Sequence, residues 1–104
     1  MSSRTSRVMY GKVAGKGAEF SVKLGCRPKI VKLFNAAAGG LVAAHKTDSM
    51  DGAFAQKEAA DGTKTFADNM VEIEDDGFKV GSDADLNASG EDLYYEAWES
   101  NHYC

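Results

Sequence analysis

Apolar and polar residues alternate with a period of two in several short stretches of the chain. Residues 19–24 are the clearest case, because Phe20, Val22 and Leu24 alternate with polar side chains. Successive side chains of an extended strand point to opposite faces, so this spacing places three apolar side chains on one face. The pattern predicts a β-strand that buries one face against a core.

Similar apolar runs recur along the chain and are separated by glycines at intervals of roughly ten residues, as in β-sandwiches and small barrels. We expect further strands at residues 8–13, 29–34, 41–45, 70–74, 78–80 and 92–99. Pro28 lacks a backbone donor and separates two of them. Asp75, Asp76 and Gly77 provide turn chemistry, so residues 70–80 predict a hairpin.

Two stretches lack this alternation. Residues 53–60 have the composition for two helical turns, but Gly52 and Gly62 lie close on either side, so residues 48–68 are expected to be mostly loop. Residues 81–90 are predicted to form a polar loop. In that loop Asp83, Asp85 and Asn87, with Ser89, are expected to cap their own backbone in a solvated connection.

The length of 104 residues accommodates one domain. We therefore predict an all-β fold, a small antiparallel β-sandwich or barrel in a single domain over residues 1–104. Residues 1–7 are expected to be a flexible basic arm and residues 100–104 a flexible tail. The alternation predicts a core made mostly of Phe20, Val22, Leu24, Ile30, Val31, Leu33, Val71, Ile73, Phe78, Val80 and Tyr95.

Charge is distributed unevenly along the chain, although the net charge is only −4. Residues 1–64 hold 11 of the 12 Lys and Arg residues and 5 of the 16 acids, whereas residues 65–104 hold Lys79 and 11 acids. In a sheet protein the two portions can interleave and cancel, which predicts a mixed surface. The alternative is charge-complementary packing between neighbouring copies.

The two cysteines, Cys26 and Cys104, lie far apart in sequence and are expected to be free thiols. Apolar stretches are far shorter than the ~20 residues that a membrane-spanning helix needs. The basic residues near the N-terminus are not followed by an apolar segment, so no secretory signal is predicted and the chain is expected to fold in a cytoplasm.

Candidate sites for metals or catalysis are weak. Residues 83–91 carry oxygen donors at alternate positions, but Ala88 and Tyr94 stand where a calcium-binding EF-hand has glycine and glutamate. His102 and Cys104 supply two soft-metal ligands, fewer than zinc requires. His45 is interpreted as an ordinary polar residue at a strand end. We expect no metal, no cofactor and no enzymatic activity.

The basic N-terminal part is the best candidate surface for a partner. Its residues Arg4, Arg7, Tyr10, Lys12 and Lys16 are the predicted partner-binding residues. Lysines and arginines with interspersed aromatics also occur in nucleic-acid-binding surfaces, with Tyr10 and Phe20 as possible stacking partners. The acidic remainder of the chain makes a nucleic-acid partner less favoured than a protein surface.

Three segments carry a family resemblance. They are LGCRPKIVKLFN at residues 24–35, ADGTKT at residues 60–65 and DGFKVGSDADLNASGEDLYY at residues 76–95. Together they resemble small virion proteins of tailed bacteriophages, over roughly residues 19–98. Cys26 stands where an aromatic residue is common in those proteins.

This resemblance implies a β-sandwich that coats the outside of a capsid, as head decoration or cement proteins do, often as trimers. The partners would be the major capsid protein and neighbouring copies of the same chain. The protein would be made in the host bacterial cytoplasm and located on the capsid surface. Related modules occur on tail fibres, so the alternative is a recognition module that binds host glycan through Trp98 or Tyr103 and the carboxylates of Asp83 and Asp85.

Overall fold

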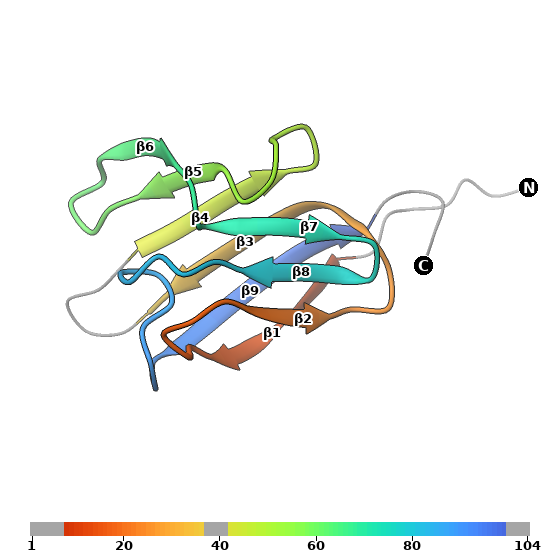
Figure 1. Ribbon diagram of the computed structural model, residues 1–104, viewed down its shortest axis with the longest axis horizontal. Coiled ribbons are helices and arrows are strands. Elements are labelled where there is room, and N and C mark those ends of the chain that lie inside the picture. Colours follow the sequence, from red (N-terminus) through yellow and green to blue (C-terminus); the bar gives the residue numbers. More distant parts are fainter. Residues whose placement is uncertain (1–7, 37–41, 100–104) are drawn as a thin grey trace, which may run out of the picture.

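In the computed structural model, which describes residues 8–36 and 42–99, short strands follow one another along the chain (Figure 1). They are β1 (Val8–Ala14), β2 (Phe20–Lys23), β3 (Pro28–Asn35), β4 (Val42–Thr47), β5 (Ala55–Glu58), β6 (Lys64–Ala67), β7 (Val71–Glu74), β8 (Gly77–Val80) and β9 (Asp92–Glu99). The predicted all-β fold is thereby confirmed.

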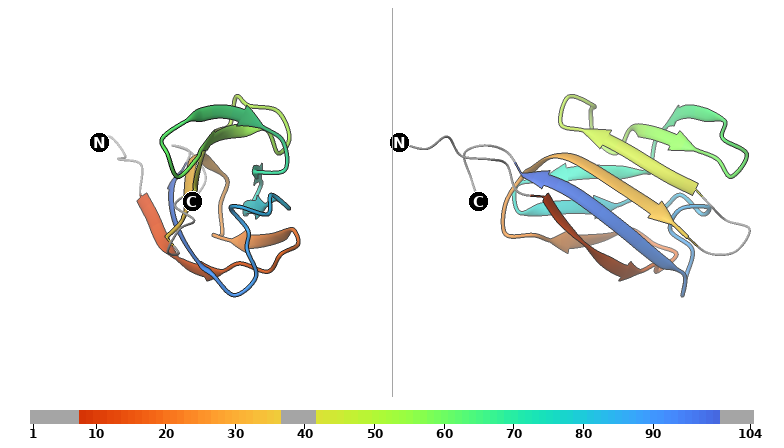
Figure 2. Two further views of the ribbon diagram at one scale, coloured as in Figure 1. Left: turned by 90° about the vertical axis from the view of Figure 1, so that its left-hand side faces the viewer. Right: turned by 180° about the vertical axis from the view of Figure 1, so that it is seen from behind.

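The strands form two antiparallel sheets of unequal size. The six-stranded sheet has the order β1-β9-β3-β4-β5-β6, and the three-stranded sheet has the order β2-β8-β7. Viewed along the long axis, the larger sheet curves along one side and the smaller sheet closes the other (Figure 2, left). The arrangement is a single sandwich-like domain in which β9, near the C-terminus, lies between β1 and β3.

The core lies between the two sheets. Val31 and Leu33 of β3 and Ala97 of β9 face Phe78 and its neighbours in the smaller sheet, and all four residues are fully buried. The ring of Phe78 meets that of Tyr95 edge to face, with 5.4 Å between centroids. This geometry suits the charge distribution of aromatic rings.

The predicted core is confirmed at most positions but is wrong at Ile30. Val31 points inward, and because side chains alternate along a strand, Ile30 points to the outer face, opposite Trp98 in the register. Buried residues that the prediction did not include are Val42, Ala44, Ala55, Met70 and Leu86. Leu93 and Ala97 follow the inward alternation of β9.

Residues 48–68 are mostly outside strands, as expected, but the expectation missed a hairpin at residues 55–58 and 64–67. Strands β5 and β6 pair there as an antiparallel hairpin, and β5 continues the large sheet beyond β4. In β5 only Ala55 is buried, whereas Gln56, Lys57 and Glu58 remain partly exposed. The hairpin therefore forms by backbone pairing and shows little apolar alternation. Such alternation was the signal on which the strand predictions depended.

The predicted hairpin over residues 70–80 is confirmed by β7 and β8, which pair from Val71 with Val80 to Glu74 with Gly77. The predicted arm at residues 1–7 and tail at residues 100–104 lie outside the described residues. Within residues 8–36 and 42–99, the chain contains no helix of the length and apolarity that a membrane span requires.

Cys26 is disulfide-bonded and only 4% exposed, so the expectation of a free thiol is wrong for this residue. Distance along the sequence was a poor guide, because strand pairing brings remote segments together. The other cysteine, Cys104, lies outside the described residues.

Lys46 is buried in the interior although it carries a charge. It follows the inward alternation of β4 and is 1% exposed. Its ammonium donates hydrogen bonds to the carbonyl oxygens of Met50 (2.7 Å), Gly52 (2.7 Å) and Phe54 (2.6 Å). Burial lowers the pKa of Lys46, since desolvation disfavours the charged form. The hydrogen bonds to these three carbonyl oxygens offset that cost and hold the β4–β5 connection in place.

Asn87, in the segment between β8 and β9, is also a buried polar residue that binds backbone groups, and it is 1% exposed. Its side-chain amide donates to the carbonyls of Ala18 and Gly81, each at 2.8 Å. Its Oδ1 accepts from the backbone N–H groups of Lys16 (2.8 Å) and Gly17 (3.3 Å). The expectation that Asn87 caps its own backbone in a solvated loop is wrong, because these bonds join segments about 70 residues apart.

Replacing Asn87 by alanine should destabilise the fold strongly. The substitution leaves buried backbone donors and acceptors without partners, at about 3 kcal/mol of lost unfolding free energy. Urea denaturation of Asn87→Ala and of Ser82→Ala, an exposed residue in the same loop, should show a large loss only in the former. Equal midpoints for the two variants would contradict the role assigned to Asn87.

Candidate functional site

The predicted partner-binding residues divide between described and undescribed parts of the chain. Arg4 and Arg7 lie outside the described residues, so the structure places only Tyr10, Lys12 and Lys16. Tyr10 and Lys12 belong to β1, which is an edge of the six-stranded sheet. The strand expected at residues 8–13 is confirmed, because residues 8–14 pair with β9 in a regular register.

Edge strand β1 presents its outward side chains to solvent. Tyr10 is 79% exposed and Val8 is 46% exposed, which is unusual for large apolar side chains. On its other side β1 has no strand neighbour among the described residues. An edge strand of seven residues offers a row of backbone groups for pairing with another chain.

Of the two lysines, Lys12 shares a surface with Tyr10, whereas Lys16 lies beyond the end of β1. Lys12 lies on the same outer face as Tyr10, and its ammonium is 3.9 Å from the carboxylate of Asp92. Lys16 follows β1, and its ammonium lies 5.4 Å above the ring centroid of Phe20. Phe20 packs against the core, so Tyr10 and Phe20 do not form a joint stacking platform for nucleic-acid bases.

Ion pairs join the basic and acidic portions of the chain, as the interleaved reading of the charge pattern predicts. Arg27 contacts Asp75 at 2.9 Å and Lys23 contacts Asp76 at 3.2 Å. Arg27 also contacts Asp48, which belongs to the basic portion itself, at 2.6 Å. The two carboxylates raise the pKa of Arg27 above its usual value, chiefly through the hydrogen bonds to Asp48. Much of the basic charge is thus neutralised within one molecule.

The oxygen-rich segment at residues 83–91 is held by a lysine. The ammonium of Lys57, on β5, lies 3.0 Å from carboxylate oxygens of both Asp83 and Asp85. Asp83 also accepts the backbone N–H groups of Asp85 and Leu86, which confirms the expected Asx-type turn at this residue. Within the described part of the chain, no cluster of three or more His, Cys, Asp or Glu residues is placed to hold a metal ion.

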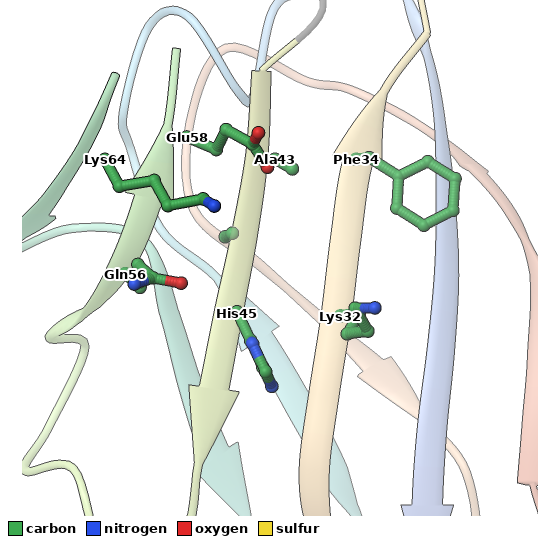
Figure 3. A pocket seen from close by; sticks show the side chains of 8 residues that line it. Lys32, Phe34, Ala43, His45, Gln56, Glu58 and Lys64 are labelled. Atoms are coloured by element: carbon green, nitrogen blue, oxygen red, sulfur yellow. The ribbon is translucent and has the colours of Figure 1, made fainter. Parts of the chain in front are cut away.

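A hollow of about 230 Å³ lies on the outer face of the large sheet and is here called the outer hollow (Figure 3). Phe34 and Lys32 of β3 stand on one side, and Glu58 of β5 with Lys64 of β6 stand on the other. The remaining lining residues are Ala43, Ala44, His45 and Gln56. A second hollow of about 290 Å³ adjoins it, since both are lined by Phe34, Ala43 and Glu58.

Strand register explains why these residues meet. Lys32, His45 and Gln56 are consecutive partners across β3, β4 and β5, and the next outward row is formed by Phe34, Ala43 and Glu58 with Lys64 of β6 opposite. Ala43 is the smallest side chain in its row, so a depression forms above it. Phe34 also stacks on Tyr94, with 6.3 Å between ring centroids.

Sequence reasoning missed the outer hollow. Alternation within residues 29–34 would have placed Lys32 and Phe34 on the face opposite to Val31 and Leu33. However, three of the eight lining residues, Gln56, Glu58 and Lys64, come from a segment that was expected to be mostly loop. His45 lies within β4 on the exposed face, and not at the strand end that the sequence suggested.

Comparison of the chain with protein-family models, with curated proteins and with solved structures finds no match.

Removing the ammonium of Lys57 should lower stability, because Lys57 and Asp83 form a largely buried ion pair whose side chains are 20% and 15% exposed. We expect Lys57→Met to lose about 2 kcal/mol near neutral pH. Lys64→Met, which removes an exposed lysine from the neighbouring strand, is the matched control and should change stability by less than about 0.5 kcal/mol.

The pH dependence of this difference follows from the pKa of Lys57, which its hydrogen bonds to Asp83 and Asp85 raise above the ordinary value of 10.5. The contribution of the Lys57 ion pairs to the unfolding free energy is complete below pH 10.5. It is lost as the pH rises through the higher pKa that Lys57 has in the folded state. Denaturant titrations should therefore show the wild-type advantage over Lys57→Met shrinking only in strongly alkaline buffer. An advantage that disappears already at neutral pH would refute the assignment.

Proposed function

We propose that this domain is a structural virion protein, a capsid decoration or cement protein that binds the outside of a phage head and stabilises it. The proposal rests on the resemblance of residues 19–98 to small virion proteins of tailed phages and on one structural observation. Edge strand β1 exposes Tyr10 and Val8 and directly follows the basic segment that contains Arg4 and Arg7. Such a strand is suited to extend across a boundary between subunits.

The proposed partners are the major capsid protein and neighbouring copies of this chain, arranged as a trimer or another closed set. A small domain has limited surface, so each copy would contribute a modest interface, and strong attachment would come from several contacts acting together. No membrane or nucleic-acid partner and no chemical step is part of this proposal. The site of action would be the capsid surface, after synthesis in the host bacterial cytoplasm.

The alternative of host-glycan recognition needs different residues from those first considered. The carboxylates of Asp83 and Asp85 are engaged by Lys57, and Tyr103 lies outside the described residues. Trp98 is half-buried on the outer face, opposite Val8 and Ile30. The structure therefore favours the contact through β1 over a glycan site at those positions.

Replacing Arg4, Arg7 and Lys12 together by alanine should lower the occupancy of the protein on particles. Lys12 is exposed and its ion pair with Asp92 is long, so its loss affects the fold little. Sedimentation of decorated particles at low and moderate salt measures occupancy, and thermal denaturation of the free variant checks the fold. Lys23→Ala, on the smaller sheet, is the control for loss of charge. Unchanged occupancy of the triple variant would exclude this contact.

Binding of the protein should raise the temperature at which undecorated shells rupture, because a ligand that binds only the intact state stabilises it by mass action. Shells saturated with wild-type protein and bare shells are heated, and the release of packaged nucleic acid is measured to give the rupture temperature of each. A chelator should leave the increase unchanged. Saturated and bare shells that rupture at the same temperature would refute the stabilising role.

A further inference from the structure

The outer hollow gathers polar side chains that have no protein partner. Among the lysines at positions 8–36 and 42–99, only Lys32 and Lys64 lack an ion pair, hydrogen bond or ring contact, and both line this hollow. His45, Gln56 and Glu58 likewise make no side-chain hydrogen bond within the described structure. Donors and acceptors are thus available together on a surface where the other described lysines make contacts of their own.

The shape of the outer hollow restricts what can bind. Strands β3, β4 and β5 each have neighbours on both sides, so the floor offers no free backbone edge to which a peptide strand could add. The apolar residues in its lining are Phe34, Ala43 and Ala44, and the other five are polar or charged. A volume of about 230 Å³ is below the ~300 Å³ at which sites for drug-sized ligands begin. The ligand unit is therefore small and mostly polar.

The charges around the outer hollow favour a singly charged anion. Lys32 and Lys64 flank it from β3 and β6, while the carboxylate of Glu58 stands between them on β5 (Figure 3). Glu58 would repel a doubly charged phosphate, but it can accept hydrogen bonds from hydroxyl groups. A ligand fits these charges if it has one carboxylate, which pairs with a lysine, and a hydroxylated ring, which donates hydrogen bonds to Glu58.

We propose that the outer hollow binds an acidic saccharide, specifically a pyranose unit that carries a carboxylate. Phe34, whose ring stacks on Tyr94, borders the sugar on the β3 side, and Lys32 or Lys64 binds the carboxylate. Gln56 and Glu58 bind the hydroxyl groups. The adjoining hollow, reached past Phe34 and Glu58, extends the site for a second sugar unit.

This site goes beyond the proposed attachment to a capsid and is independent of it. Strand β1 lies at one edge of the sheet, and the outer hollow is centred on β4, three strands away. At about 4.8 Å between neighbouring strands, the separation is on the order of 14 Å. The two proposed sites therefore use different residues, and either proposal can fail without the other.

Titration of the isotope-labelled full chain with tri-galacturonate, followed by NMR, tests the site. Chemical-shift changes are expected at the backbone amides of β3, β4 and β5 around the outer hollow, with a dissociation constant on the order of 1 mM for so small a contact area. The methyl-esterified trisaccharide, which lacks the charge, should bind about tenfold more weakly. Equal binding of the charged and esterified sugars would overturn the assignment of the lysines.

Variants locate the site on the protein. Phe34→Ala should abolish the shift changes, and Lys64→Gln, at an exposed position that tolerates substitution, should weaken binding at least threefold. Lys23→Gln on the smaller sheet is the matched control and should bind as the wild type does. No shift change with tri-galacturonate, changes confined to other surfaces, or tighter binding of inorganic phosphate or of an oligonucleotide would each refute the proposal.

Discussion

A three-stranded sheet covers only the middle of the six-stranded one, and this inequality determines which parts of the molecule are buried. Strands β7 and β8 pack over β3 and β4, where Val31, Leu33 and Phe78 are fully buried. Strand β6 is left largely exposed, and β1 exposes every second side chain. The hydrophobic effect thus stabilises the centre, and the two edges of the large sheet remain available for contacts.

Two buried polar side chains complete the fold where strand pairing ends. Lys46 binds the carbonyl groups of the β4–β5 connection, and Asn87 joins the β1–β2 connection to the segment after β8. Backbone groups in such connections cannot pair with a neighbouring strand, and burying them without partners is costly. Each side chain satisfies several of these groups at once, so the long connections are ordered without a larger apolar core.

The sequence was sufficient for the all-β class, the β7–β8 hairpin and most of the core, because these depend on local alternation. It was insufficient for the β5–β6 hairpin, whose side chains carry little apolar signal, and for Ile30, which is adjacent to an equally apolar Val31. The interactions of Asn87 and the residues of the outer hollow depend on strand order. Strand order is set by contacts between remote segments, which no local pattern reports.

The location of the two proposed surfaces follows from the same constraint. Residues that face the small sheet are committed to the core, so on the large sheet binding residues can lie only on its outer face or at its edges. Exposed Tyr10 occupies one edge, and Lys32 and Lys64, which lack partners, border the outer hollow nearer the other. Intramolecular ion pairs neutralise much of the remaining basic charge, for example at Arg27 and Lys57. A ligand that carries a negative charge would therefore meet two lysines without ion pairs at the outer hollow, since neutralised ion pairs elsewhere attract anions weakly.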